Sequence, residues 1–142
     1  RVNRRGPSVI EVAARSIGGL CSRALHFGAG ISLEEVILRH ALGMPLDALD
    51  REEAASGVMM LPIPARGVLR SVGGRERALA VPGVVGLEIG IPIGRPVVPL
   101  PEGDRYLGFA FARAAGPAEV EHALRTAATA LEIDITPGEE HC

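Results

Sequence analysis

The sequence has no lysine, because all 15 of its basic residues are arginines. The chain therefore cannot form a Schiff base through a lysine, and it has no lysine with which to hold a phosphate group. We attribute this usage, together with the abundance of alanine, glycine, valine and proline, to compositional bias and not to function.

Cysteine is scarce as well, with only Cys21 and Cys142 in 142 residues. Two cysteines do not make a disulfide framework, so we expect a cytoplasmic location. No apolar run approaches the roughly 20 residues of a membrane-spanning helix, and no signal peptide opens the chain, so we expect no membrane association. The net charge of −2 gives no electrostatic reason to expect nucleic acid as a partner.

The sequence does contain enough apolar residues for a core. Hydrophobic residues make up 47% of the chain and charged residues 23%, which is typical of an ordered globular protein. The length of 142 residues favours one domain or a compact pair of subdomains. Because the chain begins with arginine and not methionine, we expect a fragment, a processed chain or an isolated domain.

One stretch near the start, residues 9–19, combines an apolar run with charges and glycines. The aliphatic residues of 9–12 favour a short, largely buried strand. Glu11 is a carboxylate inside that run, and burying it without a partner costs several kcal/mol. We therefore expect Glu11 to meet a cation, either Arg15 or a metal ion.

Two interpretations of this stretch are open on the residues alone. Gly18 and Gly19 precede an expected helix over 19–27, so a strand end, a charged turn and a helix N-terminus would lie around a phosphate or oxyanion. Alternatively, Glu11 and Arg15 form a structural ion pair and the glycines only begin a helix, since perturbed charged pairs also occur in structural networks.

Capping, periodicity and turn signals predict the remaining elements. Ser32 and Glu35 form a capping box ahead of a helix that ends at Gly43, and 45–55 reads as a linker. Beyond the linker the pattern changes from helix to sheet. The elements expected there are strands at 57–61, 68–72, 85–91, 107–111 and 133–135, helices at 75–80 and 117–131, and an extended edge segment at 96–99.

From residue 68 the order is strand, helix, strand, strand, helix, strand, which matches a ferredoxin-like α+β unit. We therefore divide the chain into a first part at 1–44, a linker at 45–55, a small α+β subdomain with an antiparallel sheet at 56–136, and a flexible tail at 137–142. The subdomain shows no cluster of titratable residues, and a fold alone does not give a function.

The pattern Glu-x-x-x-Arg-x-x-Gly-Gly over 11–19 resembles the end of the catalytic domain of ATP-grasp ligases, above all of the L-amino-acid (dipeptide) ligases and their carbamoyl-phosphate-synthase-like and biotin-carboxylase-like relatives. The resemblance covers about residues 2–135 and continues through Ser22–Arg23, Leu38–Gly43, Ser56–Pro64 and Pro101–Gly108. It implies that 1–44 is the end of an ATP-grasp domain, with a strand and two helices, and that the α+β subdomain is the small C-terminal subdomain of such a ligase.

The reaction that this resemblance implies joins a small carboxylate to an amine through an acyl phosphate, with ATP and Mg²⁺ (or Mn²⁺) as cofactors. Glu11 matches the family's second Mg²⁺ carboxylate, which also lies against the nucleotide phosphates. Arg15 matches the arginine that holds the transferred phosphoryl group or the tetrahedral oxyanion. Gly18 and Gly19 would add N–H donors, and Gly19 would leave space for an acceptor substrate.

The sequence departs from the family pattern in two respects. Many ATP-grasp enzymes have an asparagine two residues after this glutamate as another metal ligand, whereas Ala13 stands here. The family's first metal carboxylate, its ATP-binding lysines and its adenine pocket would lie before Arg1. We therefore expect the isolated chain to be inactive and to need the upstream ATP-grasp portion of the same polypeptide as its partner.

Alternatives from other classes stay open. The ferredoxin-like order and the missing metal and lysine groups favour a non-catalytic regulatory or interaction module that binds a small ligand such as an amino acid. A cysteine-based enzyme would use Cys21, but no histidine is evident near it in sequence, and a buried structural thiol is the expectation. We expect His40 at the edge of a packed helix face and not on a metal, and open strand edges that encourage a homo-oligomer.

Overall fold

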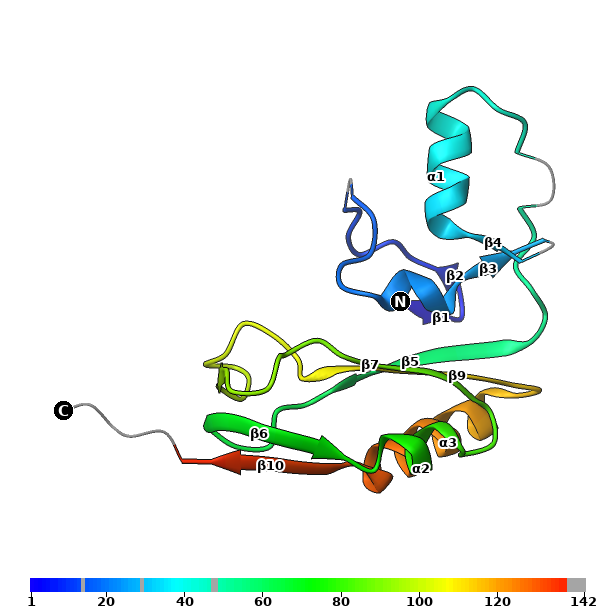
Figure 1. Ribbon diagram of the computed structural model, residues 1–142. Helices are drawn as coiled ribbons and strands as arrows, with labels where there is room; N and C mark the ends of the chain where they lie inside the picture. The colour runs from blue at the N-terminus through cyan, green and yellow to red at the C-terminus, as the bar shows by residue number, and fades with distance from the viewer. Residues whose placement is uncertain (14, 29, 47–48, 138–142) are drawn as a thin grey trace.

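The computed structural model describes residues 1–13, 15–28, 30–46 and 49–137. A three-stranded sheet of β5, β9 and β7 runs through the middle of the molecule (Figure 1). On one side of this sheet lie α1 (Leu33–Ala41), β3 and β4, and on the other side lie α2 (Arg75–Leu79) and α3 (Pro117–Ala130). None of the described helices is long and apolar enough to cross a membrane.

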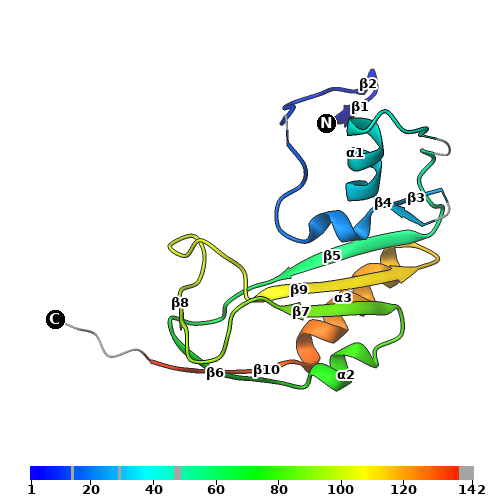
Figure 2. The same cartoon turned by 45° about the horizontal axis from the view of Figure 1, so that its top comes forward.

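The part of the chain from residue 55 to residue 136 forms two three-stranded antiparallel sheets, as far as it is described. The central sheet has the strand order β5–β9–β7, and the second sheet has the order β10–β6–β8 (Figure 2). The second sheet lies on the same side of the central sheet as α2 and α3. The strands are β5 Ala55–Leu61, β6 Gly67–Gly73, β7 Val84–Ile89, β8 Pro96–Val97, β9 Gly108–Ala114 and β10 Glu132–Thr136.

The hydrophobic core lies between the central sheet, α3 and the second sheet. Its most deeply buried residues include Leu69, Leu107 and Ala110, each with no exposed surface. Small residues on the sheet allow α3 to approach closely, because a Cβ at Gly57 would lie 2.7 Å from Cγ1 of Val120. Burial of this apolar surface is the main contribution to the stability of the fold.

The opposite face of the central sheet is also covered. Phe109 is paired with Met60 and Phe111 with Val58, and paired residues of antiparallel strands share a face. These side chains face η1 (Cys21–Ala24), which packs against both β5 and β9. The central strand β9 is therefore buried on both faces.

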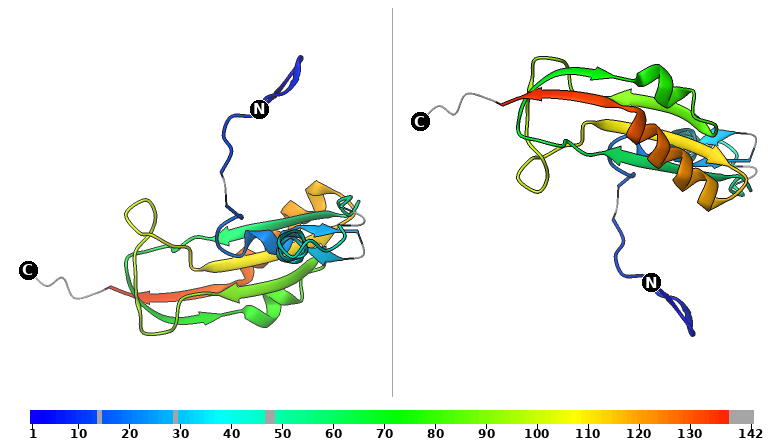
Figure 3. Two further views of the ribbon diagram at one scale, coloured as in Figure 1. Left: turned by 90° about the horizontal axis from the view of Figure 1, so that it is seen from above. Right: turned by 90° about the horizontal axis from the view of Figure 1, so that it is seen from below.

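The N-terminal part consists of short elements. β1 (Val2–Asn3) pairs with β2 (Gly6–Pro7), and β3 (His26–Phe27) pairs with β4 (Ile31–Ser32). The β1–β2 hairpin extends away from the central sheet (Figure 3).

Most elements expected for the second half are present. The α+β class and the strand–helix order from residue 68 are confirmed, as is the extended edge segment, which forms the edge strand β8. The helix after Ser32 is confirmed too, since Ser32 Oγ accepts a hydrogen bond from the Glu35 N–H at 3.1 Å. The Glu35 side chain does not complete the capping box, because it binds Arg39 instead.

Two expectations for the N-terminal half are wrong. Residues 9–12 form no strand, and Val9, Ile10 and Val12 are 81%, 80% and 83% exposed. A strand needs a neighbour for its backbone groups and a surface for its apolar face, and no described strand lies beside this segment. The helix expected over 19–27 is only the 3₁₀ turn η1, because β3 pairs with β4 immediately after it.

Some expectations fall partly outside the described residues. The linker expected at 45–55 includes residues 47 and 48, which are not described. Most of the tail expected at 137–142 also lies outside, since the description ends at Pro137.

Candidate functional site

The segment that carries the predicted site residues lies at the surface. Glu11 is exposed, and within the described residues no ion pair or hydrogen bond engages its carboxylate. The expected burial of Glu11 is therefore wrong, and burial gives no reason to require a partner cation. The structure also does not support the structural ion pair, because Glu11 and Arg15 are not joined.

Arg15 lies close to the two glycines that follow it. Its Nη1 donates to the carbonyl oxygen of Ser16 at 3.3 Å, and the same atom is 3.8 Å from the position of a Cβ built on Gly18. The Arg15 side chain is otherwise exposed. The structure thus brings Arg15 and Gly18 together, whereas it does not bring Glu11 to them.

Gly18 and Gly19 form one wall of a groove of about 540 Å³. The same groove is lined by Asp104, Arg105 and Tyr106, which precede β9, and by Phe109. The groove therefore joins the Arg15 segment to the turn before β9, two regions that are about 85 residues apart in the chain. Cys21 also lines this groove, and it is half-buried.

Gly19 has a conformation and a contact that favour glycine. Its φ angle is +64°, and a Cβ at this position would lie 2.9 Å from Cζ of Phe109. An L side chain here would be strained in the backbone and would also collide with the ring. The Phe109 ring therefore fills the space that a side chain at Gly19 would need, and Gly19 also lines the open groove.

Asp104 and Arg105 form a bidentate ion pair on the wall of the groove. Arg105 Nε donates to Oδ1 of Asp104 at 2.8 Å, and Nη2 donates to Oδ2 at 3.0 Å. Hydrogen bonding from Arg105 holds the pKa of Asp104 below its usual range, and the Asp104 carboxylate raises the pKa of Arg105. Both side chains are exposed, so the pair contributes little to stability.

Sequence reasoning did not single out Asp104, Arg105 or Phe109 as site residues. The resemblance to ATP-grasp ligases included the block 101–108 but assigned no role to any residue in it. The available signal was an Asp-Arg dipeptide in a Pro- and Gly-containing turn, which places two opposite charges at an exposed position.

A second perturbed carboxylate lies at the start of α1. Hydrogen bonding by Ser22 is the largest cause that lowers the pKa of Glu34, and Ser32 and the charge of Arg23 act in the same direction. Ser22 is itself only 5% exposed. Glu34 lies where α1 contacts η1, and a negative charge at the N-terminus of a helix is also favoured by the helix dipole.

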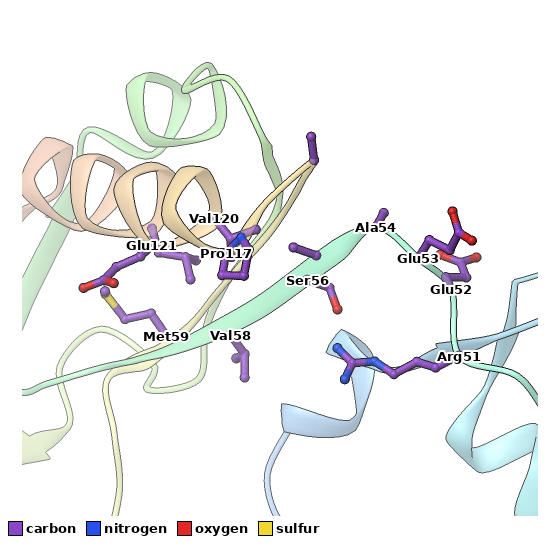
Figure 4. Close-up of a pocket in the computed structure, with 13 residues that line it drawn as sticks. Arg51, Glu52, Glu53, Ala54, Ser56, Val58, Met59, Pro117, Val120 and Glu121 are labelled. Carbon is purple, nitrogen blue, oxygen red and sulfur yellow. The ribbon is translucent and has the colours of Figure 1, made fainter.

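A larger cavity, of about 620 Å³, lies between β5 and the N-terminal half of α3 (Figure 4). Met59, Val120 and Pro117 lie toward one end, with the Glu121 side chain beside Met59. Arg51 and Glu53 line the other end. This cavity is on the α3 side of the central sheet, whereas the groove with Gly18 and Gly19 is on the η1 side. It contains none of the residues that the sequence predicted as a site.

The described residues contain no group of three or more His, Cys, Asp and Glu side chains that could hold a metal ion. His40 is exposed on α1. Glu11 therefore offers a single carboxylate. One carboxylate fits a Mg²⁺ site in which phosphates and waters supply the other oxygens.

Comparisons with known proteins match this chain to a family and to solved structures. Residues 59–136 match the model of the family "L-amino acid ligase C-terminal domain 2". The crystal structure of an L-amino acid ligase from Bacillus licheniformis matches with a TM-score of 0.70 and 23% sequence identity, over 96% of this chain and 34% of that chain. No curated protein matches the sequence. The structural match concerns the fold, and this chain spans about a third of the length of that ligase.

Proposed function

Because the chain belongs to the L-amino acid ligase C-terminal domain 2 family, we propose that it is the C-terminal part of an ATP-grasp ligase that joins a carboxylate to an amine. The match of residues 59–136 to that family carries the proposal. The fold match over 96% of the chain agrees with it, and it extends to the N-terminal part outside the family match. The upstream ATP-grasp portion of the same polypeptide would be the partner that completes the site.

The proposed reaction begins when a substrate carboxylate attacks the γ-phosphate of ATP, which gives an acyl phosphate and releases ADP. An amine then displaces the phosphate and forms the amide bond. Both steps gather negative charge on oxygens, so fixed hydrogen-bond donors are expected to supply much of the rate enhancement.

Arg15 would supply donors for these oxygens. Its guanidinium is exposed and lies beside Gly18, where a planar fork of N–H groups can hold a phosphoryl group or an oxyanion. The N–H of Gly18 would add a donor at the same wall of the groove. Gly19 lies next to it, and its contact with Phe109 would keep the backbone of this wall in place.

Glu11 would be one ligand of Mg²⁺ or Mn²⁺. When bound, the metal would neutralise part of the phosphate charge. Ala13 cannot coordinate, so the remaining ligands would be phosphate oxygens, waters and residues of the upstream portion. The exposure of Glu11 supports this role, because its carboxylate is available and not held by Arg15.

The test uses the complete polypeptide, with phosphate release from Mg²⁺-ATP measured for a panel of amino-acid pairs. We expect release that depends on both amino acids and that is mostly lost in Glu11→Gln. The matched control is Glu76→Gln, an exposed carboxylate on α2, on the other side of the central sheet. By calorimetry the 142-residue chain alone should not bind Mg²⁺-ATP tightly. Tight binding by this chain, or unchanged turnover in Glu11→Gln, would contradict the proposed roles.

A second candidate function is a module that binds a free amino acid without catalysis. The cavity between β5 and α3 favours it, because this cavity is separate from the predicted site and is lined by both an arginine and carboxylates. A free amino acid that raises the melting temperature of the chain in the absence of ATP and Mg²⁺ would support this candidate.

A further inference from the structure

The central sheet contacts the segment that follows Arg15 through residues that lie outside the predicted site. We propose that this sheet positions Arg15 by holding residues 19–24, with Phe109 as the main positioning residue. The inference rests on the proposed function, since it describes how Arg15 would be held for that reaction.

The first contact joins Gly19 to β9. The Phe109 ring lies so close to Gly19 that a Cβ would be 2.9 Å from Cζ, and the φ angle of +64° gives this residue a backbone conformation that few other residues adopt. The ring is half-buried between the groove and the sheet. Gly19 is four residues after Arg15, so the ring limits where the Arg15 segment can lie.

The other two contacts come from the neighbouring strands. Arg23 Nη1 donates to Oε1 of Glu88 on β7 at 3.0 Å, and Ser56 Oγ on β5 donates to the carbonyl oxygen of Ala24 at 2.6 Å. Glu88 and Phe109 are paired across β7 and β9, which places both side chains on the η1 face. Each strand of the central sheet therefore contributes a contact to the same short segment.

These contacts differ in strength. The side chains of Arg23 and Glu88 are 53% and 51% exposed, and exposed ion pairs contribute little. The hydrogen bond from Ser56 fixes one carbonyl of η1. The Phe109 ring makes the contact that depends most on shape. It packs against the backbone at Gly19, where a side chain would collide with it.

Residues before Arg15 provide little additional support within the described structure. The side chains of 9–12 are exposed, and the β1–β2 hairpin extends away from the sheet (Figure 3). Loss of the Phe109 contact should therefore loosen the loop that holds Arg15 and leave the rest of the central sheet folded.

Amide hydrogen exchange on this chain tests the anchoring directly. In Phe109→Ala we expect faster exchange in peptides that cover residues 16–24. Leu124→Ala is the matched control, because Leu124 is buried against the opposite face of the sheet. It should lower the melting temperature without a selective effect on 16–24. Equal exchange of 16–24 in the two variants overturns the proposal. If Phe109→Ala does not fold, Phe109→Val, which also lacks the ring, serves the same comparison.

Turnover of the complete enzyme tests the consequence. We expect Phe109→Ala to lower kcat by about 10- to 100-fold with KM for ATP changed by less than about threefold, since small misplacements of a catalytic group have effects of this size. Phe109→Leu should recover much of the rate, and Leu124→Ala should retain kcat per folded molecule. Faster exchange with an unchanged kcat would overturn the positioning role. Absence of any ligase activity in the unmodified enzyme would contradict the proposed function, and the exchange comparison would still decide the anchoring.

Discussion

The close approach of α3 to β5 predicts a specific energetic coupling between Gly57 and Val120. A Cβ at Gly57 would lie 2.7 Å from Cγ1 of Val120 and 3.3 Å from Cδ1 of Leu124. Val120 is 5% exposed, and a valine in a helix has little rotamer freedom with which to move away. Gly57→Ala therefore requires a shift of α3 or of the strand.

Two opposing effects determine how much Gly57→Ala changes the free energy of unfolding. Overpacking of a filled core costs about 1–3 kcal/mol, and alanine regains about 0.5–1 kcal/mol over glycine in a strand. We expect Gly57→Ala to lower the free energy of unfolding by about 1–2 kcal/mol as the net of these two effects. Val120→Ala alone removes two buried methyl groups and should cost about 2 kcal/mol.

The double variant provides the test. Val120→Ala removes the Cγ1 atom that the new Cβ would meet, so the double variant should be more stable than the sum of the single effects by about 1 kcal/mol or more. Urea unfolding of the four proteins, with m-values compared to check that the unfolding transition is unchanged, measures this coupling. Additive effects within about 0.3 kcal/mol would refute the packing described for β5 and α3.

Two further predictions concern the N-terminal part. Arg15→Ala in the complete enzyme should raise the activation free energy of the catalytic step by about 2–4 kcal/mol, as loss of an oxyanion donor does. The control Arg66→Ala, at an exposed turn before β6, should leave kcat unchanged. A change in melting temperature of Arg15→Ala without a change in kcat would reject the catalytic role. Ser22→Ala should raise the pKa of Glu34 toward its ordinary value of 4.5, as followed by NMR titration of the carboxyl carbon. Because the pKa of Glu34 is lowered in the folded state, the stability from this contact is present above pH 4.5 and is lost as the pH falls through the lowered value; an unchanged titration in Ser22→Ala would contradict this role of Ser22.

The second half of the chain could be predicted well because its signals are local. Pro117 begins α3, and the apolar stripe of that helix, which includes Val120 and Leu124, is buried as its spacing indicated. The alternation of 85–91 predicted the strand β7 but not the exposure of Val85, which is 66%. Val85 lies at a register shift between Val84 and Gly86, so it has no paired residue on β9 that would cover it.

The central strand β9 shows what alternation cannot tell. The alternation of Leu107, Phe109 and Phe111 with smaller residues predicted a strand but not which of its faces meets the core. In the structure Ala110 and Ala112 face α3, where small side chains permit close packing, and the two rings face η1. Both faces are covered, so residue size reports the distance to the next layer and not the side that is buried.

The first half could not be predicted in the same way, because the described residues do not cover many of its apolar side chains. The side chains of 9–12 read as a strand from their composition, yet nothing among the described residues covers them. α1 also has apolar side chains without cover. It has no buried residue, and Leu38 and the C-cap residue Leu42 are 62% and 72% exposed. A contiguous sheet and helix layer in the proposed ATP-grasp portion would cover both features. It would also place Glu11 at an interface, where a carboxylate can serve a metal shared with phosphates without the cost of a fully buried charge.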